Sequence, residues 1–478
     1  MNRPATRPAV RRALAPAAAW ATALVLAGCG SLVPPVGSPQ APLRDDFRAG
    51  AVTAAATPLD AGPAAAASEW DGFFTDDRLR RVVGLALAGN RSLRASVAAV
   101  ERARAQYGIS EANRWPDLRG TASTSQQGSD GSGTSRSYTA SLGVTAWEID
   151  LFDRLGSLQG AALARFLAQQ ETQRSARLSL VAQVADAWLT LAAEGQRLRL
   201  AEALRLSQQQ TLALNERLYR LGAASGLQRA RAQTAYEAAR GEVARSAAAV
   251  AQARLVLELL AGQPLPEALL PGAQVDTTTA LPDIPAGLPA EVLLQRPDLR
   301  AAEQQLQAAA YDVGAARAAR FPRLTLTASA GLRSPELDGL VRSGSGFWSL
   351  LPSLDLPLFD AGARQAQVDI TEATRREVMA NYEAALQSAF REVADALAVR
   401  DSLAERLDAQ RAQVDAAERS LNLAEQSYRL GASSQFELLD AQRQLAAARQ
   451  GLVALRQTEQ ANRVVLLRAL GGRWTAGG

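Results

Sequence analysis

The reactive side chains of this sequence are few, and their types exclude most catalytic chemistry. The 478 residues include no histidine, and all 52 basic residues are arginine. Without lysine or histidine there is no Walker A phosphate loop, no Schiff base, no Ser-His-Asp or Cys-His nucleophile pair and no imidazole metal ligand. Carboxylates remain, so an enzyme that uses only Asp and Glu, such as a glycosidase, stays formally possible. We expect no enzyme, no cofactor and no metal site.

Cys29 is the only cysteine, and its surroundings predict covalent lipidation. Residues 1–28 have the pattern of a signal peptide, in which an apolar stretch follows four arginines, Arg3, Arg7, Arg11 and Arg12. The stretch ends in Leu26-Ala27-Gly28-Cys29, which matches the bacterial lipobox. Such a cysteine resembles those that receive diacylglycerol on sulfur and a fatty acyl group on the α-amine; the alternative is a lone cysteine in an ordinary apolar stretch. The next residue is Gly30. An Asp there is associated with the inner membrane in enteric-type bacteria, so we expect the outer membrane.

The charge balance depends on the signal peptide. Its four arginines account for the whole formal charge of +4, so the mature chain is formally neutral. This balance gives no electrostatic reason to expect nucleic acid as a partner. No later run of about 18 apolar residues predicts an α-helical membrane span.

Two similar turns indicate the elements that must position the remaining side chains. The sequence Tyr-Arg-Leu-Gly occurs at residues 219–222 and again at 428–431, each time between two long helix-forming segments. Gly222 and Gly431 suit the left-handed end of a helix, and Ser225 and Ser434 stand where the next helix needs an N-cap. We name residues 217–233 the first tip and residues 427–443 the second tip. The chain is therefore an internal duplication.

The same pattern of elements occurs in both halves. A helix over 77–114 ends at Trp115-Pro116, and a helix over 290–320 ends at Phe321-Pro322, because the residue before proline avoids the α region. Alternating polar and apolar residues then predict a β-hairpin in each half. Long proline-free segments at 153–221 and 361–430 predict helices of about 100 Å, with return helices at 227–260 and 435–470.

These patterns divide the chain into six parts. They are a signal peptide (1–28), a lipid-anchored tether (29–70), repeat one (71–263, with hairpin 117–147 and the first tip), a linker (264–289), repeat two (290–472, with hairpin 323–356 and the second tip) and a tail (473–478).

Neither the strands nor the helices are self-sufficient in one chain. Four amphipathic strands cannot close a barrel, for which about eight is the usual minimum. Long helices with narrow apolar seams also need partners. Oligomerisation would satisfy both and would produce a hollow conduit. The competing interpretation is a helical structural lipoprotein that spaces membranes.

Several motifs together resemble one family. The sequence resembles the TolC-type outer-membrane efflux proteins, and within them the NodT/OprM-like lipoproteins of resistance-nodulation-division efflux systems. The resemblance rests on the lipobox, Trp115-Pro116, Phe321-Pro322, Leu151-Phe152-Asp153, Leu358-Phe359-Asp360, Ile284 to Pro289, Arg296 to Glu303 and Tyr428 to Arg443.

The resemblance implies an α+β fold of mostly long helices. It implies a homotrimer with a shared 12-strand transmembrane β-barrel, four strands from each protomer, and an α-helical periplasmic tunnel. Implied partners are a periplasmic adaptor protein, an inner-membrane resistance-nodulation-division pump and outer-membrane lipid. The implied function is the exit duct of a tripartite pump for small molecules such as drugs. Alternatives are a duct for type I secretion or metal efflux, and a non-conducting coiled-coil lipoprotein; the lipobox favours small-molecule efflux.

The resemblance also implies roles for residues of the tips. In that family the periplasmic tips close the tunnel with a ring of carboxylates, and Asp440 and Glu437 fall on the matching positions, with Tyr428 at the position of a tyrosine that links neighbouring coils. The alternatives are ordinary first-turn acids of a helix and a packing aromatic. Repeat one has Gln228 where some relatives have an acid, so the gate would rest on repeat two. The surface expected to meet the adaptor comprises Gly222, Arg220, Gly431 and Arg429, whose alternative role is helix capping.

Overall fold

The computed structural model describes residues 32–37, 72–129, 133–272 and 290–472. The signal peptide, Cys29, and most of the predicted tether and linker lie outside these residues. The chain divides into two compact units, and each contains parts of both repeats. Unit 1 comprises residues 1–40, 99–170 and 301–384, and unit 2 comprises residues 41–98, 171–300 and 385–478.

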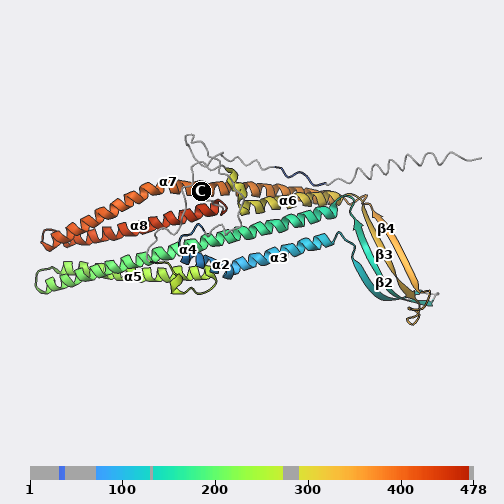
Figure 1. Ribbon diagram of the computed structural model, residues 1–478, viewed down its shortest axis with the longest axis horizontal. Coiled ribbons are helices and arrows are strands. Elements are labelled where there is room, and N and C mark those ends of the chain that lie inside the picture. The colour runs from blue at the N-terminus through green and yellow to red at the C-terminus, as the bar shows by residue number, and fades with distance from the viewer. Residues whose placement is uncertain (1–31, 38–71, 130–132, 273–289, 473–478) are drawn as a thin grey trace, which may run out of the picture. The chain divides into compact units, whose positions relative to one another are not determined.

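Long helices form most of the described chain (Figure 1). The helices α4 (Arg154–Arg220) and α7 (Ala363–Arg429) have 67 residues each, which corresponds to about 100 Å. They return through α5 (Gly226–Ala261) and α8 (Gln435–Ala469). No helix in the described part of the chain has a segment long and apolar enough to cross a membrane.

Both predicted helices that precede the hairpins are wrong as single elements. The first is divided into α2 (Asp77–Gly89) and α3 (Arg91–Ala112). Between them Asn90 is extended, its Oδ1 accepts a hydrogen bond from the Leu93 N–H at 3.0 Å, and its Nδ2 donates to the Leu260 carbonyl at 3.0 Å. Asn90 therefore caps the second helix and ties the break to α5.

The helix predicted over 290–320 is also divided. A 3₁₀ helix η2 (Ala290–Gln295) precedes α6 (Pro297–Ala318). Pro297 is the first residue of α6, a position where the missing N–H costs nothing and the fixed φ suits a helix. A short 3₁₀ helix η1 (Glu267–Leu269) follows α5.

Unit 1 contains a four-stranded antiparallel sheet that joins the two repeats. Its order is β1 (Leu118–Ser129), β2 (Gly133–Ile149), β3 (Arg323–Ser334) and β4 (Gly346–Asp355). The hairpin registers pair Leu118 with Val144 and Arg323 with Asp355, and the central β2–β3 pair aligns Tyr138 with Ser334. The pairing of β2 with β3 was not predicted, because the sequence indicated only two separate hairpins. Strands β1 and β4 are the edges of the sheet.

The main core of unit 2 lies where α2 packs among longer helices. Trp188 of α4 is 1% exposed, and it belongs to a buried cluster with Leu79 and Val83 of α2, Leu257 of α5 and Leu467 of α8. Because Trp188 and Leu467 come from different repeats, this cluster holds the two halves of unit 2 together.

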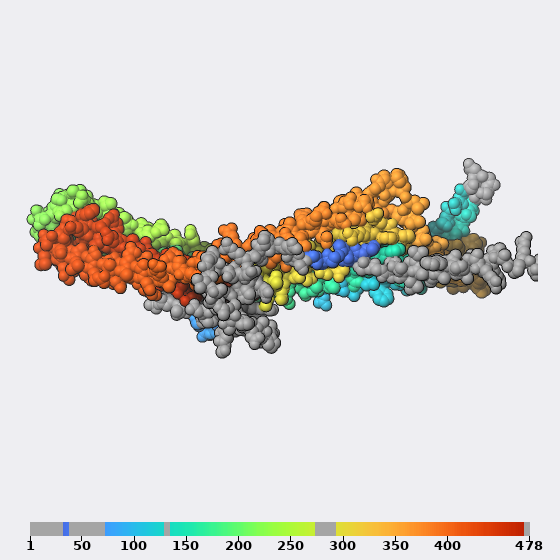
Figure 2. Space-filling model, turned by 90° about the horizontal axis from the view of Figure 1, so that it is seen from above, coloured from blue at the N-terminus to red at the C-terminus, as the bar shows by residue number. Residues whose placement is uncertain are grey.

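A short extended segment, residues 32–37, lies on the helices of repeat two within unit 1 (dark blue in Figure 2). We call it the strap. Arg317 of α6 donates to the Leu32 carbonyl at 3.4 Å, and Arg375 of α7 donates to the Pro35 carbonyl at 3.2 Å. A Cβ added at Gly314 would lie 2.6 Å from Cγ2 of Val33, so only glycine permits this approach.

Candidate functional site

The two tips, both in unit 2, have the same backbone geometry. Gly222 has φ +73° and Gly431 has φ +74°. In the first tip the Ala223 N–H donates to the Leu218 carbonyl at 2.8 Å, and in the second the Ala432 N–H donates to the Ser427 carbonyl at 2.8 Å. These six-to-one bonds, together with the left-handed glycine, define a Schellman motif. The predicted left-handed helix ends are therefore confirmed.

Each tip then begins its return helix with a capping box. Ser434 Oγ accepts from the Glu437 N–H at 3.3 Å, and the Glu437 carboxylate accepts from the Ser434 N–H at 2.7 Å. Ser225 and Gln228 make the same reciprocal pair. The two tips thus share one geometry and differ in charge, because the residue that completes the box is an acid only in repeat two.

Asp440 lies one turn after Glu437 on α8 and has local partners. Its carboxylate forms an ion pair with Arg443 and accepts a hydrogen bond from Gln444 Nε2 at 2.6 Å. The Asp440 side chain remains 30% exposed. The structure thus places Glu437 and Asp440 on successive turns beside the tip, and each makes hydrogen bonds to its own helix.

Tyr428 connects the second tip to a helix of repeat one. Its hydroxyl donates to Asn215 Oδ1 at 3.5 Å, and Asn215 is fully buried on α4. Asn215 Nδ2 in turn donates to the Thr211 carbonyl at 2.8 Å. The Tyr428 side chain is therefore half-buried, and its hydroxyl also forms a polar link between α7 and α4.

Buried amides, which the sequence patterns did not single out, make further links between the repeats. Gln208 Nε2 donates to Gln442 Oε1 at 2.8 Å, and Gln442 Nε2 donates to Ser207 Oγ at 3.0 Å. Closer to the tips, Gln435 Nε2 donates to the Gln228 carbonyl at 3.1 Å. These hydrogen bonds could have been suspected from a glutamine in an otherwise apolar helical seam, because a buried amide there needs a specific hydrogen-bond partner.

The tip residues expected to face a partner are at the surface. Arg220 ends α4 and is exposed, and Arg429 ends α7 with its guanidinium 3.6 Å from Glu425. Leu221 and Leu430, which precede the two glycines, are 75% and 84% exposed. Each tip therefore presents an arginine, an exposed leucine and an open glycine backbone.

A buried arginine holds the start of α6 to the middle of α7 and to the end of α8 in unit 2. Arg296 is 6% exposed, and its guanidinium donates to Asp298 at 2.7 and 3.0 Å, to Glu392 at 3.0 Å and to the Ala469 carbonyl at 3.3 Å. Burial alone would raise the pKa of Asp298, but the hydrogen bonds and charge of Arg296 outweigh it, so the pKa lies below its ordinary value.

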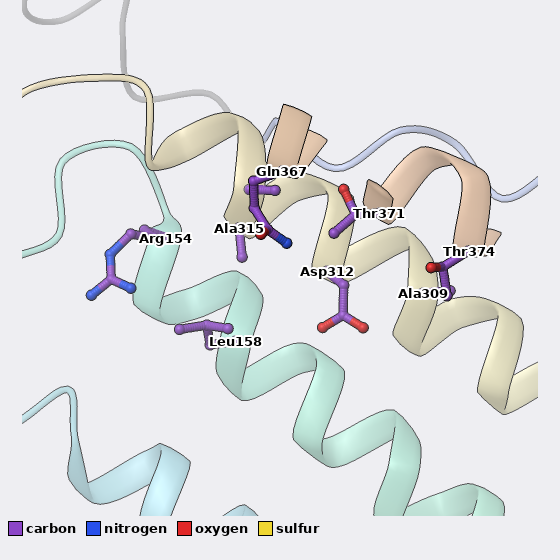
Figure 3. Close-up of a pocket in the computed structure, with 9 residues that line it drawn as sticks. Arg154, Leu158, Ala309, Asp312, Ala315, Gln367, Thr371 and Thr374 are labelled. Carbon is purple, nitrogen blue, oxygen red and sulfur yellow. The ribbon is translucent and has the colours of Figure 1, made fainter. Parts of the chain in front are cut away.

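A second candidate site is a cavity of about 410 Å³ among α4, α6 and α7 of unit 1 (Figure 3). Asp312 points from α6 into the space between the helices and forms an ion pair with Arg165. Burial raises the pKa of Asp312 although Arg165 acts against it. Across the residues that the structure describes, no group of three or more His, Cys, Asp or Glu side chains could hold a metal ion. The cavity is also lined by the charged Arg154, by hydroxyl and amide groups from Gln367, Thr371 and Thr374, and by apolar side chains such as Leu158.

Comparison with known proteins assigns the family. The model of the family described as "Outer membrane efflux protein" matches residues 82–263 and 288–472. The outer membrane protein OprJ of Pseudomonas aeruginosa is 39% identical over 82% of this chain and 81% of its own length. The toluene efflux pump outer membrane protein TtgC of Pseudomonas putida is 38% identical over the same shares.

A solved structure agrees with the sequence relatives. The cation efflux system protein CusC of Escherichia coli is 36% identical over 82% of this chain and 85% of its own length. A crystal structure of CusC matches with a TM-score of 0.83 at 34% identity, and covers 92% of this chain and all of that one.

The chain belongs to the outer membrane efflux protein family. The predicted family and the predicted α+β class with long helices are confirmed. The family places the chain in the outer membrane as part of an efflux pump, which fits the expectation that it is no enzyme.

Proposed function

We propose that this chain forms the exit duct of a tripartite efflux pump that exports small molecules, such as drugs, across the periplasm and the outer membrane. The observation that carries the proposal is the four-stranded sheet with two open edges, followed by helices of 67 residues. Three copies would supply twelve strands, enough to close a barrel, and would surround a tunnel with the long helices.

The proposed assembly has defined partners. The tips of unit 2, with Arg220, Gly222, Arg429 and Gly431, would meet a periplasmic adaptor, and the adaptor would join the duct to an inner-membrane resistance-nodulation-division pump. The identical Schellman geometry of both tips supports this, because one adaptor surface can then recognise two similar positions in each chain.

The lipid anchor is a further part of the proposal. Cys29 would carry diacylglycerol and a fatty acyl group, with no other cofactor. Only two residues separate Cys29 from the strap, so the anchor would be held close to the seat of the strap in unit 1. Cys29→Ser should abolish labelling of the chain with radioactive palmitate, and persistent labelling would exclude Cys29 as the site.

Asp440 and Glu437 would form the gate at the second tip. Three copies would bring about six carboxylates around a narrow opening, where they would repel each other and favour cations. Asp440 is the better candidate, because Glu437 already completes a capping box that Gln228 completes without charge in repeat one.

The deciding measurement is planar-bilayer conductance of the detergent-extracted protein, wild type beside Asp440→Ala. We expect a small, cation-favouring conductance that increases in the variant. Asp408→Ala is the matched control, because Asp408 forms the same i,i+3 pair with Arg411 but lies about 30 Å before the end of α7.

Each outcome discriminates among the alternatives. Equal conductance of wild type and Asp440→Ala would keep the duct and remove the gate role of Asp440. No conductance from demonstrably inserted protein would favour the non-conducting lipoprotein. Relatives are named for both toluene and cation efflux, so complementation of a duct-deficient strain with toluene, drugs and metal ions would distinguish small-molecule efflux from metal efflux.

A further inference from the structure

The central seam of the sheet carries an aromatic contact at its base. Strand β2 ends at Ile149, and three residues later Phe152 stacks on Phe321, which precedes β3. Their ring centroids are 4.7 Å apart with an interplanar angle of 19°. This contact joins repeat one to repeat two, because β2 and β3 belong to different repeats.

The duplication supplies a second set of the same groups. Trp115-Pro116 stands before β1 as Phe321-Pro322 stands before β3, and Leu358-Phe359-Asp360 follows β4 as Leu151-Phe152-Asp153 follows β2. Within one chain this second pair is not joined. Trp115 is 73% exposed and Phe359 is 91% exposed, the largest exposed fraction of any large apolar side chain in the described part of the chain.

In the described sheet the strands next to these two rings, β1 and β4, also lack a neighbouring strand on one side. Consecutive strands are antiparallel, so β4 runs opposite to β1, and the edge of β4 in one copy can continue the antiparallel order into β1 of the next. An open edge flanked by exposed aromatic rings has the features of an unfinished interface.

We propose that Phe359 of one copy stacks on Trp115 of the next copy, so that the seam between copies repeats the Phe152–Phe321 seam within the chain. This inference rests on the proposed trimeric duct and names the side chains that close it. Three copies would then have six aromatic contacts, of which half are within chains and half are between chains.

The charged part of the seam differs between the two settings. Within the chain Arg323 forms an ion pair with Glu148 at 2.8 Å. When the two repeats are aligned by these motifs, Asp117 corresponds to Arg323 and Asp355 corresponds to Glu148, so both positions of the second set are acids. The ion pair therefore cannot be repeated between copies, and the rings are the part of the contact that both seams share.

Cysteine cross-linking tests the proposal. The variant Trp115→Cys/Phe359→Cys, in detergent extracts treated with copper phenanthroline or a short bismaleimide, should give covalent dimers and closed trimers on a denaturing gel. The matched control Phe152→Cys/Phe321→Cys should lose its free thiols but keep the mass of one chain. Each single variant should give no multimers.

Co-expression makes the test specific for contacts between copies. A tagged Trp115→Cys chain with an untagged Phe359→Cys chain should give the mixed dimer. Bilayer conductance and native mass of the double variant verify that it folds and assembles.

The outcomes distinguish failure of the proposed Phe359–Trp115 contact from failure of the proposed duct. A conducting trimer whose Trp115→Cys/Phe359→Cys chains remain single, while the control pair cross-links, would overturn the seam and leave the duct. A monomer without conductance, in wild type as well, would overturn both.

Discussion

Replacement of Gly431 by alanine isolates the backbone requirement of the tip. Gly431 has φ +74°, and a Cβ at this position would meet no heavy atom within 4 Å. The cost therefore comes from the left-handed conformation alone, about 1–2 kcal/mol for a residue with a Cβ. Because the tip can open without the rest of the chain, this energy should appear as local rather than global destabilisation.

Hydrogen exchange measures that local opening. The N–H groups of Gly431 and Ala432 close the Schellman motif at 3.1 and 2.8 Å. A loss of about 1–2 kcal/mol corresponds to roughly 5- to 30-fold faster exchange in a peptide that covers residues 427–434. Gly431→Asn should cost less, because asparagine tolerates the left-handed region better than alanine.

A glycine inside a helix provides the opposite control. Gly241 lies within α5, and its added Cβ would also meet nothing within 4 Å. Gly241→Ala should therefore stabilise the helix by about 0.5–1 kcal/mol and slow exchange around it. Unchanged protection in Gly431→Ala, or a loss of equal size in Gly241→Ala, would refute the reasoning.

Three further perturbations test other parts of the fold. Leu257→Ala should destabilise the buried cluster of unit 2 by about 2–5 kcal/mol in denaturant unfolding, whereas Leu259→Ala, at a residue 76% exposed on the same helix, should cost far less. Asp298→Asn should lower the denaturant midpoint at pH 7, because Arg296 holds the pKa of Asp298 below its ordinary value. The stability that this carboxylate contributes is present above the unfolded pKa of about 3.9 and is lost as pH falls through the lower folded pKa, so the midpoints of wild type and variant should converge as the pH falls through that range. Arg317→Gln should speed hydrogen exchange of the strap and leave α6 unchanged, and an unaffected strap would show that its seat does not depend on this guanidinium.

Local signals in the sequence were sufficient for the turns and caps of the two tips. Glycine followed by Ser-x-x-Glu or Ser-x-x-Gln specifies a helix end and a helix start within a dozen residues, so both tips could be placed before the structure was known. The positions of Glu437 and Asp440 beside the second tip follow from the same signals. Their roles in a gate stay predictions, because a gate is a property of several copies.

Contacts between distant residues could not be predicted in the same way. Gln208 and Gln442 are 234 residues apart, and helical periodicity gives the face of each amide but not its partner. The helix break at Asn90 could not be predicted for a related reason, since one polar residue inside a periodic pattern does not by itself end a helix. The prolines of residues 30–68 predict an extended tether or a strap that lies on the body of the protein, but they do not indicate its partners Gly314 and Arg317, which occur far along the chain.

The strap also has a consequence for the order of folding. Leu32 and Arg317 are 285 residues apart, so the first described segment of the chain is held by helices that are synthesised much later. Contacts of such long sequence separation form late, because the intervening chain must be ordered before they can stabilise anything. The seat of the strap does not exist until α6 and α7 have formed. A seated strap is therefore a marker that repeat two is complete, and a chain interrupted between the repeats would leave its N-terminal segment exposed to proteases that remove incomplete proteins.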